Sequence, residues 1–430
     1  MLNIFKNIRP FTSYCLYDWA NSPFSTVVIT FVFASYFEKA IVGDPEKASI
    51  MWGWAISFSA ILIAIFSPFI GRHIDKNFSH KFWLILFTFI SSVGAALLWF
   101  AYPIESSVVF VLSILVISNL SFELGGVVYN SLIPNFAIKN KIGEISGKAW
   151  AAGYLGGIVC LVIILFGFIQ TESPLFGIDK DNAANIRVAG PFVALWFILF
   201  SLPLFNNISN INSKVIQNKN SVFKDVIKSF KSIFAYNDVG KFLLARMVYT
   251  DGLNTLFAFG GLYASGTFNM SFSEIIIFGI MINITAGLGA LFFSYLDDKV
   301  GPKLIILISL FFLIIIGVFT LFITNKNLFL ILGSALGFFI GSVQASSRSF
   351  MARFIKNGNN TEIFGFYAVS GKCTAFIGPA VISILVYFYD SQRIGMSSII
   401  AFLVIGFLLM IYVSEPKKLM PKMSNTSKNH

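Results

Sequence analysis

Twelve apolar segments divide the chain, and they constrain its fold more than any other feature of the sequence. A helix needs about 20 apolar residues to cross the hydrocarbon core of a bilayer, and the strict alternation of a membrane barrel strand is absent. The segments therefore predict an all-α integral membrane protein with 12 transmembrane helices. Their expected bounds are 14–41, 50–70, 82–102, 107–131, 146–169, 189–205, 242–265, 272–295, 304–324, 327–349, 363–389 and 395–414.

The basic residues are unevenly divided between the two sides of the membrane that these segments define. The N-terminus and every second loop hold 23 of the 31 Lys and Arg residues, the opposite loops hold six, and two lie within segments. Because cytoplasmic loops are enriched in Lys and Arg, we expect both termini in the cytoplasm. Topology thus accounts for the net charge of +11, and we expect no nucleic-acid partner.

Three short motifs recur in the same order, each six segments further along the chain. They are DWANSPF (18–24) with DGLNTLF (251–257), GRHIDK (71–76) with SYLDDK (294–299), and EISG (144–147) with EIFG (362–365). A recurrence after six segments preserves the orientation in the membrane, so it predicts two parallel six-helix repeats, the arrangement of major facilitator transporters. We expect these parts, in order: an N-terminal half over 1–205, a cytoplasmic linker over 206–241, a C-terminal half over 242–414 and a cytoplasmic tail over 415–430.

The linker ends in an amphipathic segment. Seven apolar residues between Val222 and Phe234 share one helical face, whereas Lys224, Lys228 and Lys231 lie away from it. Two arrangements fit this pattern. The helix either lies on the inner leaflet of the bilayer, where the lysines meet anionic lipid, or packs on the protein as a solvated linker.

Four stretches of the chain resemble the vacuolar amino-acid effluxer family associated with autophagy and its bacterial relatives, a branch of the major facilitator superfamily. They are YDWANSPF with the following VVITFVFASYF, SGKAWAAGYLGG, GSVQASSRSFMARFI and FGFYAVSGKCTAFIGP. The resemblance covers nearly the whole chain. It implies 12 helices, alternating access and the movement of small organic solutes, and the eukaryotic members suggest amino acids as the cargo.

Five ionisable residues lie within the apolar segments, namely Asp18, Glu123, Arg246, Asp251 and Lys372. Each costs about 2.5 to 3.5 kcal/mol on insertion, and such residues usually face a cavity or a partner. Desolvation disfavours the charged form of a carboxyl group, so the three acids are candidate proton carriers or counter-charges for a substrate amine. Capping of the first helix is the other interpretation of Asp18.

The basic residues of the segments have interpretations of their own. Arg246 either pairs with Asp251, five residues further on, or extends to the cytoplasmic interface. Lys372 either binds an anionic group or neutralises Glu123. Arg348 is expected to mark the cytoplasmic end of the tenth segment.

Four amide side chains are further candidates for substrate contacts or for bonds between the halves. Two of them lie three residues beyond Asp18 and Asp251, and therefore on the same helical faces. The four are Asn21, Asn130, Asn254 and Gln344.

The repeated loop motif carries Asp75 and Lys76 in the first half and Asp298 and Lys299 in the second. A carboxylate close to helix ends and basic side chains can form a latch that stabilises the outward-facing state and breaks when the halves rock. We therefore predict a gating role for these four residues, and charge that only sets the topology is the alternative.

These features together predict a secondary active transporter that moves a small polar metabolite by alternating access, with proton coupling as a hypothesis. A sugar–cation symporter or a lipid-like solute exporter of the same fold is an alternative, and a non-transporting membrane receptor or scaffold is an alternative of another class. The chain lacks the motifs G-x-x-x-x-G-K-[S/T], G-x-S-x-G and H-E-x-x-H, so we expect neither ATP use nor enzymatic activity.

Isolated Cys and His residues predict no metal site or cofactor. Short loops suit a bacterial inner membrane, whereas the resemblance implies a vacuolar membrane if the source is eukaryotic.

Overall fold

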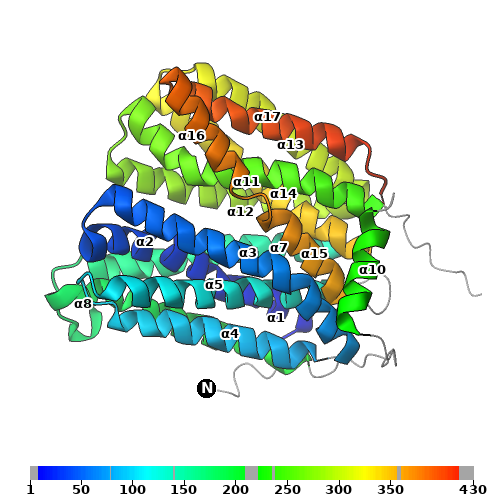
Figure 1. The fold of residues 1–430 in the computed structure, drawn as a ribbon, viewed down its shortest axis with the longest axis horizontal. Coiled ribbons are helices and arrows are strands. Elements are labelled where there is room, and N and C mark those ends of the chain that lie inside the picture. Colours follow the sequence, from blue (N-terminus) through cyan, green and yellow to red (C-terminus); the bar gives the residue numbers. More distant parts are fainter. Residues whose placement is uncertain are drawn as a thin grey trace, which may run out of the picture.

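The computed structural model describes residues 8–77, 79–138, 141–208, 221–234, 238–355 and 360–415, and these are helical with short connections (Figure 1). Three π-helical stretches, 24–31, 37–42 and 165–169, extend neighbouring helices. The α-helices are α1 (Pro10–Pro23), α2 (Val32–Tyr36), α3 (Pro45–Asn77), α4 (His80–Leu97), α5 (Ser107–Ser131), α6 (Ile133–Phe136), α7 (Ile142–Ile164), α8 (Ala184–Arg187), α9 (Ala189–Asn207), α10 (Val222–Phe234), α11 (Asp238–Phe268), α12 (Phe272–Val300), α13 (Pro302–Phe322), α14 (Lys326–Arg353), α15 (Asn360–Lys372), α16 (Ile377–Tyr389) and α17 (Gln392–Ile411).

Eleven helical stretches of the described residues are long and apolar enough to cross a membrane. The helix α11 is not among them because Arg246, Asp251 and Asn254 lower its hydropathy. Its 31 residues, at about 1.5 Å each, nevertheless exceed a hydrocarbon core of about 30 Å. With α11 included, the stretches match the 12 predicted segments one for one, and the predicted all-α membrane fold is confirmed.

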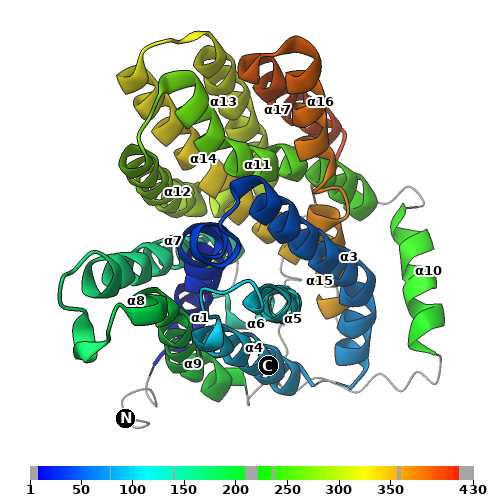
Figure 2. The same ribbon diagram turned by 60° about the vertical axis from the view of Figure 1, so that its left-hand side comes forward.

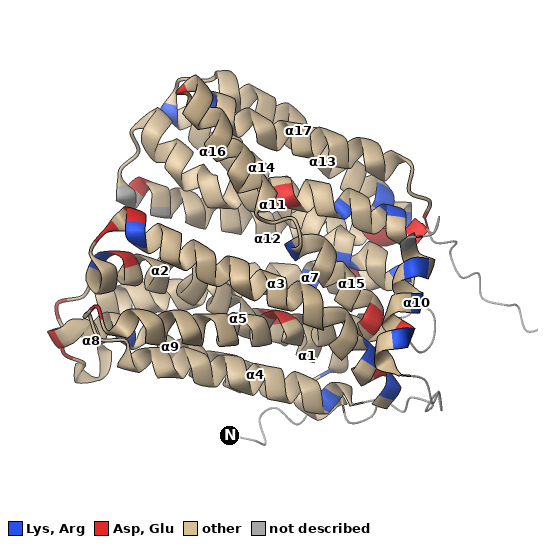
Figure 3. Ribbon diagram, viewed as in Figure 1, with Lys and Arg blue, Asp and Glu red and all other residues tan. Residues whose placement is uncertain are grey.

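The helices gather into two groups, one from residues 10–207 and one from residues 238–411 (Figures 1 and 2). The helix α7 lies between α1 of its own group and α12 of the other, while α3 and α5 pack against α15 (Figure 2). Lys, Arg, Asp and Glu concentrate at the two ends of the bundle and are sparse in its middle (Figure 3). This distribution is the one that a bilayer around the middle requires.

Glycines allow the two groups to approach closely at one end. A Cβ atom on Gly71 of α3 would lie 2.5 Å from the Thr361 carbonyl oxygen, and one on Gly147 of α7 would lie 2.3 Å from the Ser294 Cβ atom. Ser294 stands where Gly71 stands in the first loop motif, and Gly147 on the facing helix leaves the space that this serine needs. Each helix pair therefore has a glycine at its closest point.

We expect Gly147→Val to prevent the close packing of α7 on α12 and to lower the free energy of unfolding by about 1–3 kcal/mol, because no space exists for the added carbons. Unfolding midpoints of the detergent-solubilised protein measure this effect. The control is Gly53→Val, where no atom lies within 4 Å of the added Cβ position. Equal stability of the two variants would show that the helix pair does not require close approach.

The predicted segment 363–389 is interrupted, because α15 ends at Lys372 and α16 begins at Ile377. Pro379 explains the interruption, since proline lacks the backbone N–H of a continuous helix and its ring clashes with the preceding turn.

The predicted amphipathic helix is α10, which crosses one end of the bundle and contacts α3 and α11 (Figure 1). Its buried side chains include Asp225, Val226 and Ile233, whereas Phe223 and Ile227 are exposed on a neighbouring flank. The helix thus packs on the protein and also keeps an apolar flank. Apart from Glu415, the predicted tail lies outside the described residues, as does 209–220 of the linker.

Candidate functional site

A cavity of about 650 Å³ lies between the two groups of helices. It extends to Thr320 near the end of α13 and to Phe329 near the start of α14, whereas none of the described residues in 294–300 or 349–355 lines it. The cavity is therefore directed toward one end of the bundle and is blocked at the other. Its charged and amide-bearing lining residues are Asp18, Asn21, Glu123, Asn130, Arg246, Asn254, Asn283, Gln344, Arg348 and Lys372.

Asp18 forms a buried ion pair with Arg348, which joins α1 of one group to α14 of the other. The Arg348 Nη1 atom lies 2.8 Å from Asp18 Oδ2, and only 3% of the Arg348 side chain is exposed. The guanidinium also donates to the Ser146 hydroxyl at 3.0 Å and to the Ser146 carbonyl at 2.6 Å. The expectation that Arg348 marks the end of its helix is wrong, since the residue is buried inside. Asp18 lies well within α1, so it does not cap that helix.

Glu123 and Lys372 form a second ion pair between the two groups, from α5 to the last residue of α15. Their Oε1 and Nζ atoms are 2.6 Å apart, and the side chains are 24% and 32% exposed. The structure therefore contains the pairing that the sequence left as one of two interpretations. Because both side chains line the cavity, the pair is accessible from it.

Arg246 does not pair with Asp251, and it does not extend to the end of the bundle. Its Nη1 atom donates to the Tyr367 carbonyl and to the Ser370 hydroxyl, both at 2.6 Å. The guanidinium carbon lies 3.5 Å from the centroid of the Tyr367 ring, which is a cation–π contact. These contacts direct Arg246 toward α15 and place it on the cavity wall.

Asp251 lies outside the cavity lining and is 3% exposed. A Cβ atom on Gly378, just inside α16, would lie 3.3 Å from Asp251 Oδ1. That oxygen accepts no hydrogen bond from the described residues. The two aspartates of the duplicated motif therefore do not both face the cavity.

The four predicted amide side chains contact neighbours at the cavity wall. Asn21 Nδ2 donates to Asp18 Oδ1, and Asn254 Nδ2 donates to the Gly371 carbonyl, both at 3.4 Å. Asn130 Oδ1 accepts from Arg348 Nη1 at 3.4 Å, and Gln344 Oε1 accepts from the Tyr154 hydroxyl. Tyr154 could not be singled out from the sequence, because an isolated tyrosine in an apolar segment carries no signal of its own.

At the blocked end, two carboxylates bind the N-termini of helices in the opposite group. Asp75 accepts hydrogen bonds from the backbone N–H groups of Thr361 at 3.0 Å and Glu362 at 2.8 Å, where α15 begins. Asp298 accepts from Gly143 and Glu144, both at 2.8 Å, where α7 begins. A carboxylate here satisfies free N–H groups and the positive end of the helix dipole.

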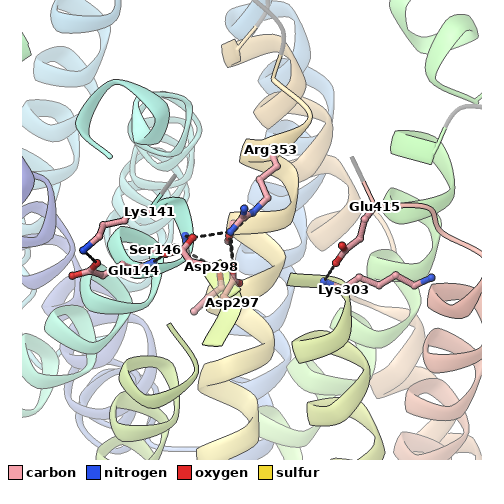
Figure 4. A network of polar contacts seen from close by, with 11 residues as sticks. Lys141, Glu144, Ser146, Asp297, Asp298, Lys303, Arg353 and Glu415 are labelled. Atoms are coloured by element: carbon pink, nitrogen blue, oxygen red, sulfur yellow. Dashed lines mark hydrogen bonds and ion pairs between the residues drawn. The ribbon is translucent and has the colours of Figure 1, made fainter. Parts of the chain in front are cut away.

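Further ion pairs surround these two carboxylates. Arg353 lies 2.7 Å from Asp297 Oδ1 and 2.8 Å from Asp298 Oδ1, and Figure 4 shows it directed at both. Arg72 joins Asp225 of α10 at 2.8 Å and Glu362 of α15 at 3.5 Å. The sequence pointed to neither Asp297 nor Arg353, although Asp297 is adjacent to Asp298 in the loop motif.

The two predicted gating lysines differ from the aspartates. Lys299 is exposed and takes part in no ion pair of the described residues, whereas Lys76 is half-buried on α3. The contacts across the blocked end therefore centre on the aspartates.

Comparisons with known proteins agree on the family. The family model "Vacuole effluxer Atg22 like" matches residues 40–421. YxiO of Bacillus subtilis, an uncharacterized MFS-type transporter, is 24% identical over 411 residues, 94% of each chain. Autophagy-related protein 22 of Kluyveromyces lactis is 24% identical over 388 residues, 82% of this chain and 77% of the relative.

Solved structures agree on the fold. The Major Facilitator Superfamily transporter FucP in its outward conformation has a TM-score of 0.72 at 14% identity, over 96% of this chain and all of that one. The proton:xylose symporter XylE has a TM-score of 0.70 at 14% identity, over 94% of this chain and 95% of its own. The chain therefore belongs to the Atg22-like vacuole effluxer family of the major facilitator superfamily, and it is a membrane transporter rather than an enzyme.

Proposed function

We propose that the protein is a secondary active transporter that moves a small polar metabolite, an amino acid or a similar solute, by alternating access. One observation carries the proposal: a cavity between two helix groups is blocked at one end by hydrogen bonds of the Asp75 and Asp298 carboxylates, which join the two groups. Rocking of the halves 1–205 and 242–414 would break these contacts and open the cavity at the blocked end. The four amide side chains then contribute substrate contacts.

We further propose that the blocked end is cytoplasmic, so that the cavity faces outward. The blocked end carries α10 and the repeated loop motifs, which belong to the loops rich in Lys and Arg. This orientation keeps both termini in the cytoplasm, in an inner membrane of a bacterium or a vacuolar membrane of a eukaryote.

Proton coupling through Glu123 is part of the proposal. Its side chain is 24% exposed, lines the cavity and pairs with Lys372 of the opposite group. A proton that neutralises Glu123 removes the attraction across the interface, and thereby links protonation to the separation of α5 from α15.

We expect Glu123→Gln to reduce pH-gradient-driven accumulation in proteoliposomes by about tenfold or more, while exchange of labelled for unlabelled solute continues. The uptake assay uses a labelled mixture of amino acids. The matched control is Glu105→Gln, whose side chain is 84% exposed outside the cavity and pairs only with Lys47.

Unchanged gradient-driven accumulation in Glu123→Gln would exclude coupling through this carboxyl group. Flux of sugars or lipids instead of amino acids would favour the alternative cargoes, and no flux of any solute by a folded preparation would favour a receptor or scaffold.

A further inference from the structure

We propose that Arg246 binds a carboxylate group of the transported solute, so that the substrates are small organic solutes that carry a carboxylate. This inference rests on the proposed transport function and names the substrate class of the same cavity.

The charged side chains that line the cavity carry a net positive charge in the described part of the chain. Two acids and three cations line it in the described part of the chain. Asp18 is paired with Arg348, and Glu123 is paired with Lys372. Arg246 is left without a carboxylate partner among the described residues, and the cavity carries one excess positive charge. An isolated cation at membrane depth is unfavourable, so an anionic group that enters the cavity gains most at this position.

The guanidinium of Arg246 is held in one orientation on the cavity wall. Nη1 is occupied by the Tyr367 carbonyl and the Ser370 hydroxyl, and the ring of Tyr367 lies against the face of the guanidinium. These contacts fix the plane of the group. The N–H groups of Nε and Nη2 have no acceptor in the described part of the protein. Adjacent N–H groups of this kind form the planar fork that binds a carboxylate through two parallel hydrogen bonds.

Two polar neighbours of Arg246 on α11 also line the cavity. Thr250 and Asn254 follow it at intervals of four residues, and all three line the cavity. Asn254 uses its amide nitrogen for the Gly371 carbonyl, which leaves its oxygen as an acceptor. A solute whose carboxylate binds Arg246 thus meets polar groups over two further turns of α11. The cavity volume of about 650 Å³ suits a small organic solute.

The test measures binding without transport. The full-length protein in detergent is heated in the presence of each of the 20 amino acids. Further samples contain, for each amino acid, the corresponding amine without the carboxylate or the corresponding acid without the amine, and one sample contains glucose. We expect carboxylate-bearing compounds to raise the unfolding temperature of the wild type. Arg246→Gln should weaken their apparent affinity by about tenfold or more, and Arg246→Lys by less, because lysine keeps the charge but not the fork.

A matched control and a second readout separate this inference from the transport proposal. Lys241→Gln removes a cation from the same helix outside the cavity, and it should bind as the wild type does. Uptake into proteoliposomes is then measured with the same compounds. Carboxylate binding without uptake would support the inference and contradict the transport function.

Two results would overturn the inference. The first is uptake of the amines or glucose that Arg246→Gln leaves unchanged, in which case transport stands and the carboxylate site does not. The second is a folded wild type that no carboxylate stabilises. If Arg246→Gln does not fold, the same measurements on Arg246→Lys, which keeps a cation in place, decide between these results.

Discussion

Arg348→Met is expected to lower the free energy of unfolding by about 3 kcal/mol or more and to abolish transport. The substitution leaves the Asp18 carboxylate beside an apolar side chain, and it removes the two hydrogen bonds to Ser146. Breaking a buried ion pair costs more than removing both partners, because the remaining charge has no counter-charge. The pair and its bonds to Ser146 join α1, α7 and α14.

Denaturation of the purified protein with SDS measures this effect in a cycle with Asp18→Asn and the double variant. The double variant should recover more than half of the loss in stability. Arg393→Met is the matched control, since Arg393 forms no ion pair with the described residues and donates to the carbonyl oxygens of Leu321 and Ile323. Additive effects of the two single substitutions would show that Asp18 and Arg348 are not coupled.

Replacement of both Asp75 and Asp298 by alanine is expected to favour the conformation in which the blocked end is open. Each carboxylate accepts two backbone hydrogen bonds from a helix N-terminus of the opposite group. Loss of such a cap costs about 0.5–2 kcal/mol, so the two substitutions together shift the balance between the conformations by about tenfold or more. Each single variant should shift it by less.

A cysteine in place of Asn130 on the cavity wall reports this shift, in a background without native cysteines. Its reaction with a membrane-impermeant thiol reagent should become faster from the cytoplasmic side in the double alanine variant. Asp44→Ala is the matched control: Asp44 also accepts two backbone hydrogen bonds, from Glu46 and Lys47, but within its own group. Faster reaction in Asp44→Ala as well would show that the effect is not specific to the interface.

The sequence predicted the helices well because a bilayer requires an apolar run for each crossing. It also predicted that Asp75 and Asp298 act at equivalent places, because the same loop motif occurs twice. Contacts between the halves were harder to predict from the sequence. Asp18 and Arg348 are 330 residues apart, and no local pattern links them. The polar run from Ser346 to Ser349 was the available signal, since consecutive polar residues leave no face of the helix for lipid.

Asp251 shows where the argument from repeats fails. Glu144 and Glu362 are related by 218 residues, and by the same offset Asn130 corresponds to Arg348. The arginine that pairs with Asp18 therefore has an amide as its counterpart in α5, so Asp251 lacks an equivalent partner. The break before α16 also depends on Pro379, which has no counterpart at that offset because residue 161 is Leu161.

Distance measurements between spin labels at both ends of the bundle test alternating access most directly. Labels at the exposed positions His73 and Lys299 span the blocked end, and labels at Glu46 and Asn327 span the other end. In the double alanine variant of Asp75 and Asp298, the first distance should increase and the second should decrease relative to the wild type. Distances that stay unchanged at both ends, or that increase together, would contradict alternating access between two rocking halves.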